Sequence, residues 1–219
     1  MPGPGSTAPD RRRERSLRTR ARVVEAATGL FVDHGYLATT IETVAERAGV
    51  AVQTVYYAFG TKRALLAAVL DASIAGDAEP LAVLERPWFD ALDGEPDARS
   101  AVAHLVEAAV VILSRAAPVY EVVRRAAADA EVGELLDANR AGRRADQRRL
   151  VGLLDEAGHL RAGLDLDTAA DVTYGLLNEE VFQLLTVDCG WPVDRFRRWA
   201  TDLMVDQLTG PDQSSSYSP

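Results

Sequence analysis

The residues with the most informative chemistry lie close together in the sequence, within residues 39–62. A short apolar-patterned segment there, residues 52–59, carries one amide and two adjacent phenols: Gln53, Tyr56 and Tyr57. A glutamine amide pairs with the N6 and N7 edge of adenine, and hydroxyl groups reach phosphate oxygens. A helix of eight residues is about 12 Å long, which fits a major groove about 12 Å wide. These residue types therefore predict a surface suited to duplex DNA.

Smaller groups around this segment extend the predicted DNA surface. Val52 and Thr54 offer methyl groups to the methyl group of thymine. Thr39 and Thr40 stand at a helix start, where free N–H groups can receive a phosphate. Lys62, the only lysine in the chain, is also expected at a phosphate.

Two short helices are needed to position these groups. Thr39 is expected to open the first of them, with Glu42 three positions later completing a capping box, and Gly49 to end it. A glycine adopts the positive φ that a sharp connection often demands. Residues 39–62 therefore predict a helix-turn-helix. A compact helical hairpin without a DNA-binding role has the same pattern, so the pattern alone leaves both interpretations open.

The rest of the chain has mostly helical periodicity, and no segment alternates as a strand does. Outside the helix-turn-helix, we expect a helix over 17–34 and another that begins at Thr61. A Pro/Gly-rich break follows at 86–97. After the break, the expected helices cover 98–116 (ended by Pro118), 119–128, 132–157, 167–187 and 193–208. We predict an all-α fold with an N-terminal three-helix, helix-turn-helix DNA-binding domain and a larger C-terminal helical bundle.

Charge is distributed unevenly along the chain. The net charge is −9, yet residues 10–63 contain ten basic and six acidic residues, and residues 64–219 contain fourteen basic and 27 acidic ones. Such asymmetry indicates an N-terminal part that meets a polyanion and an acidic remainder that stays clear of it. A solvated arginine-rich tail would give the same asymmetry.

Several classes of protein are not expected. Charged residues interrupt each apolar stretch before the roughly 18 residues that a membrane span requires, and no secretory signal is visible. The single cysteine, Cys189, cannot form an intramolecular disulfide, which fits a reducing compartment. We therefore expect a cytoplasmic protein that does not contact a membrane.

Catalysis is not expected either. The three histidines are far apart, and no metal-binding, nucleophile or phosphate-loop motif is present. Glu179 and Glu180 are adjacent, so on a helix they point about 100° apart and make a poor acid/base couple. We predict no catalytic residue, no metal site and no cofactor.

Residues 19–70 contain a series of short motifs: Thr19-Arg20, Val23-Val24, Ala26-Ala27, Phe31, Gly35-Tyr36, Thr39-Thr40-Ile41, Val44-Ala45, Ala48-Gly49-Val50, Val55 to Phe59, and Lys62. In these motifs the segment resembles the N-terminal domain of the TetR/AcrR family of bacterial transcriptional regulators. The resemblance implies base contacts from Val52 and Gln53, phosphate contacts from Thr40, Tyr56, Tyr57 and Lys62, and a DNA-contacting role for Arg20. Ala51 stands where the family usually has Ser or Thr, which removes a helix cap and a phosphate contact.

The resemblance also implies a homodimer that binds a small-molecule effector. The dimer interface would come from 167–187 and 193–208, and the residues expected there are Leu177, Val181, Leu184, Phe196, Trp199 and Leu203. The residues expected to bind the effector are polar groups on apolar helices: His104, Tyr120, Tyr174 and Asn178. The first set could instead complete each monomer's own core, and the second could simply bond neighbouring carbonyls.

Four domains follow from this interpretation. Residues 1–16 are a disordered basic arm, 17–62 the helix-turn-helix DNA-binding domain, 63–210 the helical ligand-binding and dimerisation domain, and 211–219 a disordered tail. Arg11–Arg15 of the arm either reach an adjacent minor groove or are solvated.

The expected function is that of a sequence-specific repressor, which an effector releases from a palindromic operator by shifting the fourth helix. An activator of the same family and a non-specific architectural DNA-binding protein are the alternatives.

Overall fold

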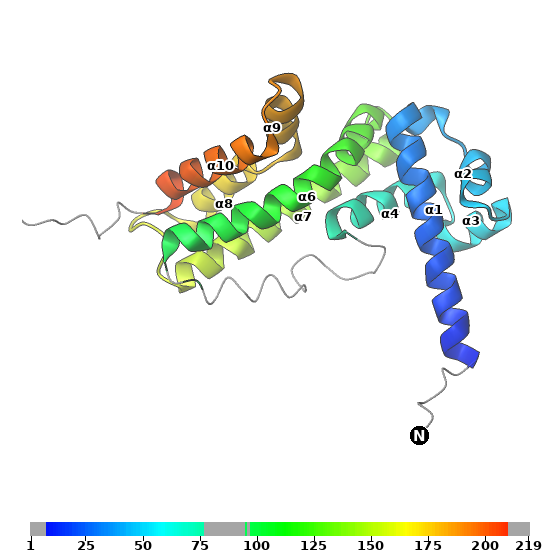
Figure 1. Ribbon diagram of the computed structural model, residues 1–219, viewed down its shortest axis with the longest axis horizontal. Coiled ribbons are helices and arrows are strands. Elements are labelled where there is room, and N and C mark those ends of the chain that lie inside the picture. Colours follow the sequence, from blue (N-terminus) through cyan, green and yellow to red (C-terminus); the bar gives the residue numbers. More distant parts are fainter. Residues whose placement is uncertain (1–7, 77–94, 96, 210–219) are drawn as a thin grey trace, which may run out of the picture. The chain divides into compact units, whose positions relative to one another are not determined.

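The computed structural model describes residues 8–76, 95 and 97–209, and every regular element in that part of the chain is a helix. This confirms the predicted all-α class. The chain forms two compact units: unit 1 comprises Met1–Pro80 and Pro118–Leu136, and unit 2 comprises Leu81–Ala117 and Asp137–Pro219. Two long helices, α6 (Ala98–Ala126) and α7 (Ala130–Glu156), contribute residues to both units (Figure 1). The division into a DNA-binding and a ligand-binding domain stays a prediction.

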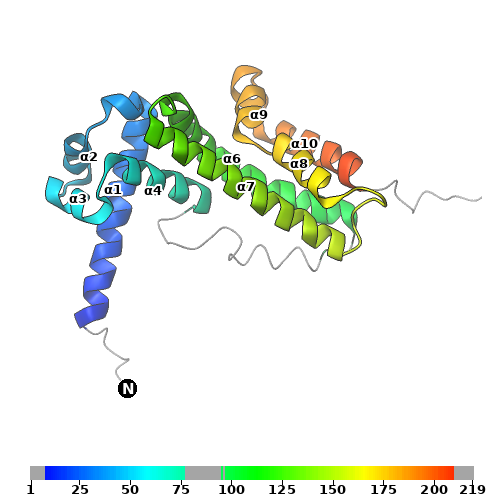
Figure 2. The ribbon, with the colours of Figure 1, turned by 180° about the vertical axis from the view of Figure 1, so that it is seen from behind.

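Unit 1 contains one long helix and three shorter helices that pack together. They are α1 (Ala8–Ala38), α2 (Ile41–Ala48), α3 (Val52–Phe59) and α4 (Lys62–Ala75). Helices α2 and α4 pack on α1, and α3 packs on α2 and α4 (Figure 2). The predicted bounds of α2, α3 and α4 hold to within about two residues, as is usual for helix ends.

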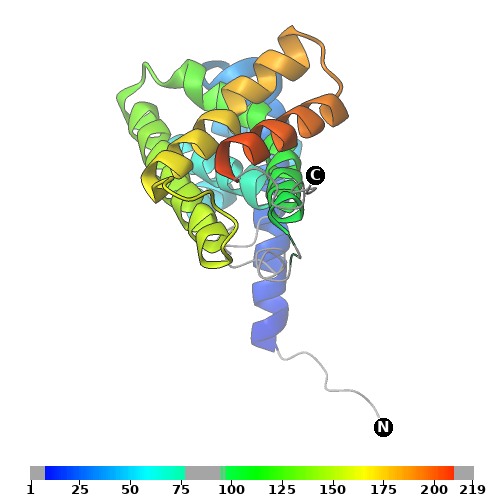
Figure 3. The same ribbon diagram turned by 90° about the vertical axis from the view of Figure 1, so that its left-hand side faces the viewer.

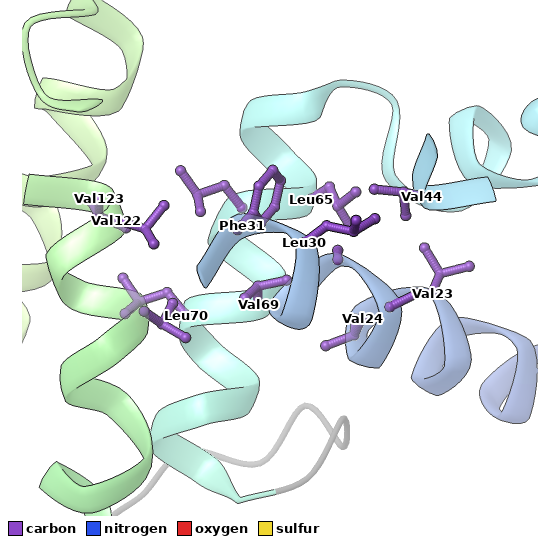
Figure 4. Close-up of a cluster of buried hydrophobic side chains, with 14 of the residues drawn as sticks. Val23, Val24, Leu30, Phe31, Val44, Leu65, Val69, Leu70, Val122 and Val123 are labelled. Atoms are coloured by element: carbon purple, nitrogen blue, oxygen red, sulfur yellow. The ribbon is translucent and has the colours of Figure 1, made fainter. Parts of the chain in front are cut away.

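The core of unit 1 joins these helices to the end of α6. Phe31 of α1, Leu65 of α4 and Val123 of α6 are all fully buried in one cluster (Figure 4). Each such side chain contributes about 1.5–3 kcal/mol when it leaves water. The core therefore fixes α1 and α4, and these two support the short helices α2 and α3.

The first helix is longer than the sequence pattern predicts. It begins at Ala8 rather than at Leu17, and its first turns extend beyond the other helices of unit 1 (Figure 3). The segment is rich in arginine and glutamate, which favour helix, and Arg18 pairs with Glu14 one turn earlier at 2.5 Å. Residues 1–7 of the predicted arm lie outside the described residues, as do residues 211–219 of the predicted tail.

Unit 2 contains the first part of α6, most of α7 and the C-terminal helices. These are α8 (Leu166–Leu176), α9 (Glu179–Gln183), the π-helical segment η3 (Leu184–Asp188) and α10 (Val193–Leu208). Helices α8 and α10 lie side by side, and the bounds of α10 are those predicted (Figures 1 and 2). Phe182 and Phe196 meet edge to face in the core, with ring centroids 5.0 Å apart.

The prediction that Pro118 ends a helix is wrong. Helix α6 runs through Pro118, although a proline removes one backbone hydrogen bond to the preceding turn. Pro118 and Ser114, whose carbonyl loses that bond, are both exposed, so water can solvate the carbonyl. The residues that follow, including Val119 and Val123, are buried in unit 1, and their packing favours continuation of the helix.

The prediction of one helix over 167–187 is also wrong. Helix α8 ends at Leu176, and Asn178 then opens α9 as its N-cap, with its side-chain oxygen accepting from the N–H of Val181 at 2.8 Å. The amide group of Asn178 donates to the carbonyl of Gly175 at 2.8 Å. One asparagine therefore satisfies backbone groups on both sides of the break.

Helix α6 is long and apolar enough to cross a membrane by length and composition, with a mean hydropathy of 1.6 over its most apolar window. The sequence analysis excluded such a segment. The helix nevertheless has the burial pattern of a core helix, since Ala101, Val102 and Val106 are fully buried within unit 2. Its apolar character is explained by packing inside the protein.

Candidate nucleic-acid interface

The connection between α2 and α3 is a sharp turn at Gly49. This residue has φ 63° and ψ 42°, and its N–H group bonds to the carbonyl of Glu46 at 3.0 Å. A Cβ atom at Gly49 would lie 3.0 Å from the Nη2 atom of Arg22, so both conformation and space favour glycine. The predicted helix-turn-helix is therefore present, with Gly49 as its hinge.

The start of α2 differs in detail from the predicted capping box. Thr40, rather than Thr39, is the N-cap, and its hydroxyl oxygen accepts from the N–H of Thr43 at 3.2 Å. Thr43 returns the contact, because its hydroxyl accepts from the N–H of Thr40 at 3.1 Å. Threonine at the third position thus replaces Glu42 as the partner. Thr40 is exposed, which leaves the N-terminus of α2 open to an anion.

Thr39 has a structural role within unit 1. Its side chain is buried, and the hydroxyl donates to the carbonyl oxygens of Leu30 at 3.1 Å and Gly35 at 2.9 Å. The hydroxyl therefore secures the end of α1 and is turned away from solvent.

Helix α3 presents its polar residues on one outward face. Tyr57 is 94% exposed, Tyr56 is 48% exposed and Gln53 is exposed as well. These three residues are spaced three and four positions apart, so they share one side of the helix. Val55, on the opposite side, is buried in the core and fixes the orientation of that face. The structure thus brings Gln53, Tyr56 and Tyr57 together as predicted.

The two remaining predicted residues of α3 are less accessible. Val52 and Thr54 are half-buried. Ala51, at the N-cap position, makes no side-chain cap, so the missing Ser or Thr has no substitute here. The helix is held by its surroundings more than by its own ends.

Lys62 is tethered close to the end of α1. Its Nζ atom lies 4.3 Å from the centroid of the Tyr36 ring and donates to the carbonyl of Leu37 at 3.4 Å. Partial burial lowers the pKa of Lys62 below its usual 10.5, and the charge of Asp129 partly opposes this effect. An ammonium group has three donors, so the tether leaves donors for a phosphate.

Arg20 is turned toward the end of α3. Its Nη1 atom donates to the carbonyl of Ala58 at 3.2 Å, and the guanidinium carbon lies 4.4 Å from the centroid of the Phe59 ring. Arg22, which the sequence analysis did not single out, contacts the turn before α3. The only sign of this role in the sequence is that Arg22 is a basic residue on the helix that precedes the helix-turn-helix.

The residues predicted to bind an effector do not form one cluster. Tyr120 lies in the core of unit 1, whereas the other three lie in unit 2. His104 pairs with Glu95 at 2.9 Å, and the guanidinium carbon of Arg143 lies 5.2 Å from the Tyr174 ring centroid. Asn178 caps α9.

The predicted dimer residues divide into buried and accessible groups. Leu177 and Phe196 are buried within unit 2 and complete the protein's own core. Val181, Trp199 and Leu203 are all half-buried, and Leu184 is 52% exposed. Val187, which the prediction did not include, is 71% exposed.

A buried polar stripe on α7 also escaped the sequence analysis. Arg143 pairs with Glu179 in the interior of unit 2, where their side chains are 14% and 3% exposed. The carboxamide oxygens of Asn139 and Gln147, one turn to either side of Arg143, are buried without a hydrogen-bond partner. Spacings of four residues among Asn139, Arg143 and Gln147 were the available signal. No group of three or more potential metal ligands occurs in the described part of the chain.

Comparison with known proteins supports the helix-turn-helix assignment. The family described as bacterial regulatory proteins, tetR family, matches residues 23–69. Over 61 residues the chain is 39% identical to the HTH-type transcriptional regulator TtgR of Pseudomonas putida, which corresponds to 28% of this chain and 29% of that protein. The chain thus spans less than a third of the length of the curated relative that it matches. The matched family is one of regulatory proteins.

Solved structures resemble the fold over most of the chain. The fatty acid degradation regulator FadR from Bacillus halodurans aligns with a TM-score of 0.69 and 19% identity, covering 85% of this chain and 94% of that one. FadR from Bacillus subtilis, in complex with stearoyl-CoA, aligns with a TM-score of 0.66 and 17% identity, covering 85% and 98%. At these identities the likeness concerns the fold.

Proposed function

We propose that this chain, whose residues 23–69 match the tetR family of bacterial regulatory proteins, is a sequence-specific DNA-binding transcriptional regulator. In this proposal it is a cytoplasmic homodimer that represses transcription from a palindromic operator and is released by a small-molecule effector. Activation in place of repression is the alternative, and it would use the same contacts between α3 and DNA.

One observation carries the DNA-binding proposal. Gln53, Tyr56 and Tyr57 stand on the exposed face of an eight-residue helix whose opposite face is anchored by the buried Val55. Gln53 supplies the hydrogen-bonding edge for a base, and the phenols supply phosphate contacts on either side. The open N-terminus of α2 and the ammonium of Lys62 add contacts that set the register without reading sequence.

Selection of bound duplexes from a random pool tests the proposal. We expect a twofold-symmetric consensus, with wild-type affinity at least about 10³ times higher than for unrelated duplexes. Gln53→Ala should relax the preference at one position in each half-site. Gln207→Ala, an exposed glutamine on α10, is the matched control and should leave the consensus unchanged. Absence of any enriched sequence would instead favour a non-specific architectural protein.

The dimer is proposed from the need for two recognition helices and from exposed apolar residues near the C-terminus. Two half-sites about 34 Å apart require two copies of α3. Leu184, Val187 and Val193 are large apolar residues that are 52%, 71% and 38% exposed within ten residues of sequence. Burial of these side chains between two copies would supply the apolar centre that stable interfaces have.

Light scattering on the purified chain tests the dimer directly. Val187→Asp should shift the protein toward the monomer at micromolar concentration, because a charge would be buried between the copies. Val111→Asp, at an exposed valine of α6, is the matched control and should leave the dimer intact. A wild-type protein that is monomeric at these concentrations contradicts the proposal.

The effector is proposed to act on α4. The ends of α6 and α7 belong to the same apolar cluster as Leu65, Leu66 and Val69 of α4, and both helices also belong to unit 2. A molecule that displaces α6 or α7 within unit 2 would therefore shift α4 and the spacing of the recognition helices. Moving the population from 1:99 to 99:1 requires a preference of about 5.5 kcal/mol for the released state. A metabolite panel that never changes operator affinity would refute this part alone.

A further inference from the structure

Arginines from a single turn of α1 contact the C-terminal end of α3 and the turn that leads into this helix. At the C-terminal end, Arg20 donates to the carbonyl of Ala58 at 3.2 Å and lies over the ring of Phe59 at 4.4 Å. This pairing uses the planar guanidinium twice, once through an N–H group in its edge and once through its face. The end of α3 is therefore held by two contacts of one guanidinium group.

At the other end, Arg22 contacts the turn that leads into α3. Its Nη2 atom donates to the carbonyl of Ala48, the last residue of α2, and lies 3.4 Å from the carbonyl oxygen of Gly49. Carbonyls at a helix C-terminus have no partner within the helix and carry partial negative charge. The guanidinium satisfies both requirements and fixes the backbone at Gly49, three residues before α3 starts at Val52.

Helix α3 needs such external support. It has eight residues, its N-cap Ala51 makes no side-chain contact, and Val55 is its only buried residue. Isolated helices of this length are marginal in water. Its position relative to DNA must therefore be set by neighbouring elements.

Arg20 also lies near α4. Burial raises the pKa of Asp71 on α4, and the positive charge of Arg20 partly reverses that shift. Arg20 thus interacts with the end of α3 and with a carboxylate on the helix proposed to respond to the effector.

We propose that Arg20 and Arg22 are positioning residues that hold the C-terminal end of the recognition helix and the turn that leads into it, and that neither acts as a phosphate ligand. This inference rests on the proposed DNA-binding function, and it replaces the role in DNA contact that the sequence suggested for Arg20. Loss of either arginine removes no group that faces DNA, but it loosens the helix that carries those groups.

Two measurements on the full-length protein test the inference. The first is amide hydrogen exchange of α3 in the free protein, which requires no DNA. Arg20→Ala and Arg22→Ala should increase exchange in residues 52–59 by about tenfold, the factor expected for loss of one charge-assisted hydrogen bond. Arg18→Ala is the matched control on α1, because Arg18 is 75% exposed and its ion pair is with Glu14 of the same helix. Unchanged exchange in both variants would overturn the inference.

The second measurement is the salt dependence of affinity for the duplex that wild-type protein selects from a random pool. Loss of a phosphate ligand lowers the slope of log K against log salt by about 0.9, whereas loss of a positioning residue lowers affinity without changing the slope. We expect affinity to fall about tenfold with an unchanged slope in Arg20→Ala and in Arg22→Ala. A slope that is lower by about 0.9 in either variant would identify a phosphate ligand and overturn the inference.

The two measurements distinguish failure of this inference from failure of the proposed DNA-binding function. If the wild-type protein selects no duplex, the proposed function fails, while the exchange measurement still decides whether the arginines hold α3. If Arg20→Ala does not fold, both measurements can be made on Arg22→Ala, because Arg22 is an exposed residue whose contacts are with the turn before α3.

Discussion

The two units differ in the polar groups that they bury. In unit 1 the candidate recognition residues Gln53 and Tyr57 are exposed, and the buried hydroxyl of Thr39 donates to two carbonyls. In unit 2 the ion pair of Arg143 and Glu179 is buried. Unit 1 therefore has an apolar interior and a polar exterior suited to a polyanion. Unit 2 holds charged and polar groups inside, where they cost stability unless they are fully paired.

This difference explains why one unit is the easier to interpret from sequence. On a surface that contacts DNA, the type of each side chain indicates which group of the DNA, a base edge or a phosphate, it can bind. An interior polar stripe depends on which helices face each other, and helical periodicity does not determine that.

The largest effect should come from breaking the buried ion pair. Arg143→Met leaves Glu179 buried without its partner and should lower the free energy of unfolding by about 3–5 kcal/mol. The double variant Arg143→Met/Glu179→Leu should recover most of that loss, because no uncompensated charge remains. Urea denaturation measures both values.

A surface pair on the same helix provides the control. Arg144 pairs with Asp171 at 2.7 Å, but the two side chains are 62% and 53% exposed. Arg144→Met should therefore cost less than about 1 kcal/mol. Equal losses from Arg143→Met and Arg144→Met would mean that unit 2 does not depend on its interior charges.

A smaller effect is expected at the exposed face of unit 1. Tyr57→Phe removes one hydroxyl from a side chain that is 94% exposed, so the free energy of unfolding should change by less than about 0.5 kcal/mol. Affinity for the selected duplex should fall about five- to tenfold, the cost of one hydrogen bond to a phosphate. Fluorescence anisotropy measures it. Tyr174→Phe in unit 2 is the matched change and should leave DNA affinity unaltered, so equal losses would disprove a specific role for Tyr57.

The sequence predicted unit 1 well because its signals are local. Gly49 needs a positive φ, Val55 is apolar between polar neighbours, and the bounds of α3 agree with those predicted. The failures involve competition between local and tertiary terms. At Pro118 the local preference was outweighed by the packing of Val119 and Val123.

Side-chain partners were less predictable than helices. Thr43, in place of Glu42, completes the cap of α2, because either residue can bond to the free N–H group there. Asn178 was predicted to bind an effector, yet it caps α9. An asparagine on a helical pattern gives no sign of whether its amide bonds to its own backbone or to a ligand, since both uses need the same two groups.

Two asparagines of unit 2 allow the free-energy cost of a buried, unpaired polar atom to be measured. The side-chain oxygen of Asn139 is buried without a partner, whereas that of Asn178 accepts from the N–H of Val181. Asn139→Leu should raise the free energy of unfolding by about 1 kcal/mol, because an unsatisfied polar atom is replaced by an apolar one of similar size. Asn178→Leu should lower it by about 1 kcal/mol through loss of the cap. Thermal unfolding distinguishes the two signs, and a destabilised Asn139→Leu would show that its oxygen has a partner.

The smallest effect concerns the pH dependence of DNA binding. Partial burial lowers the pKa of Lys62, so its ammonium group loses its proton at a lower pH than an exposed lysine would. Burial, with the charges of Asp129 and Glu131, raises the pKa of the neighbouring Tyr36, which therefore stays neutral over the same interval. Because a phosphate contact requires the charged form of Lys62, affinity should fall as the pH rises from about 7 to about 9.5 at constant ionic strength, and by more than an exposed lysine would produce.

Lys62→Arg supplies the control for this pH profile. A guanidinium group keeps its charge throughout that interval, so the variant should bind the selected duplex with a flatter profile than the wild type. Anisotropy titrations at matched salt compare the two proteins. Parallel profiles would assign the pH dependence to other groups of unit 1, and would mean that the contact of Lys62 with Tyr36 and Leu37 withdraws its ammonium group from the DNA surface.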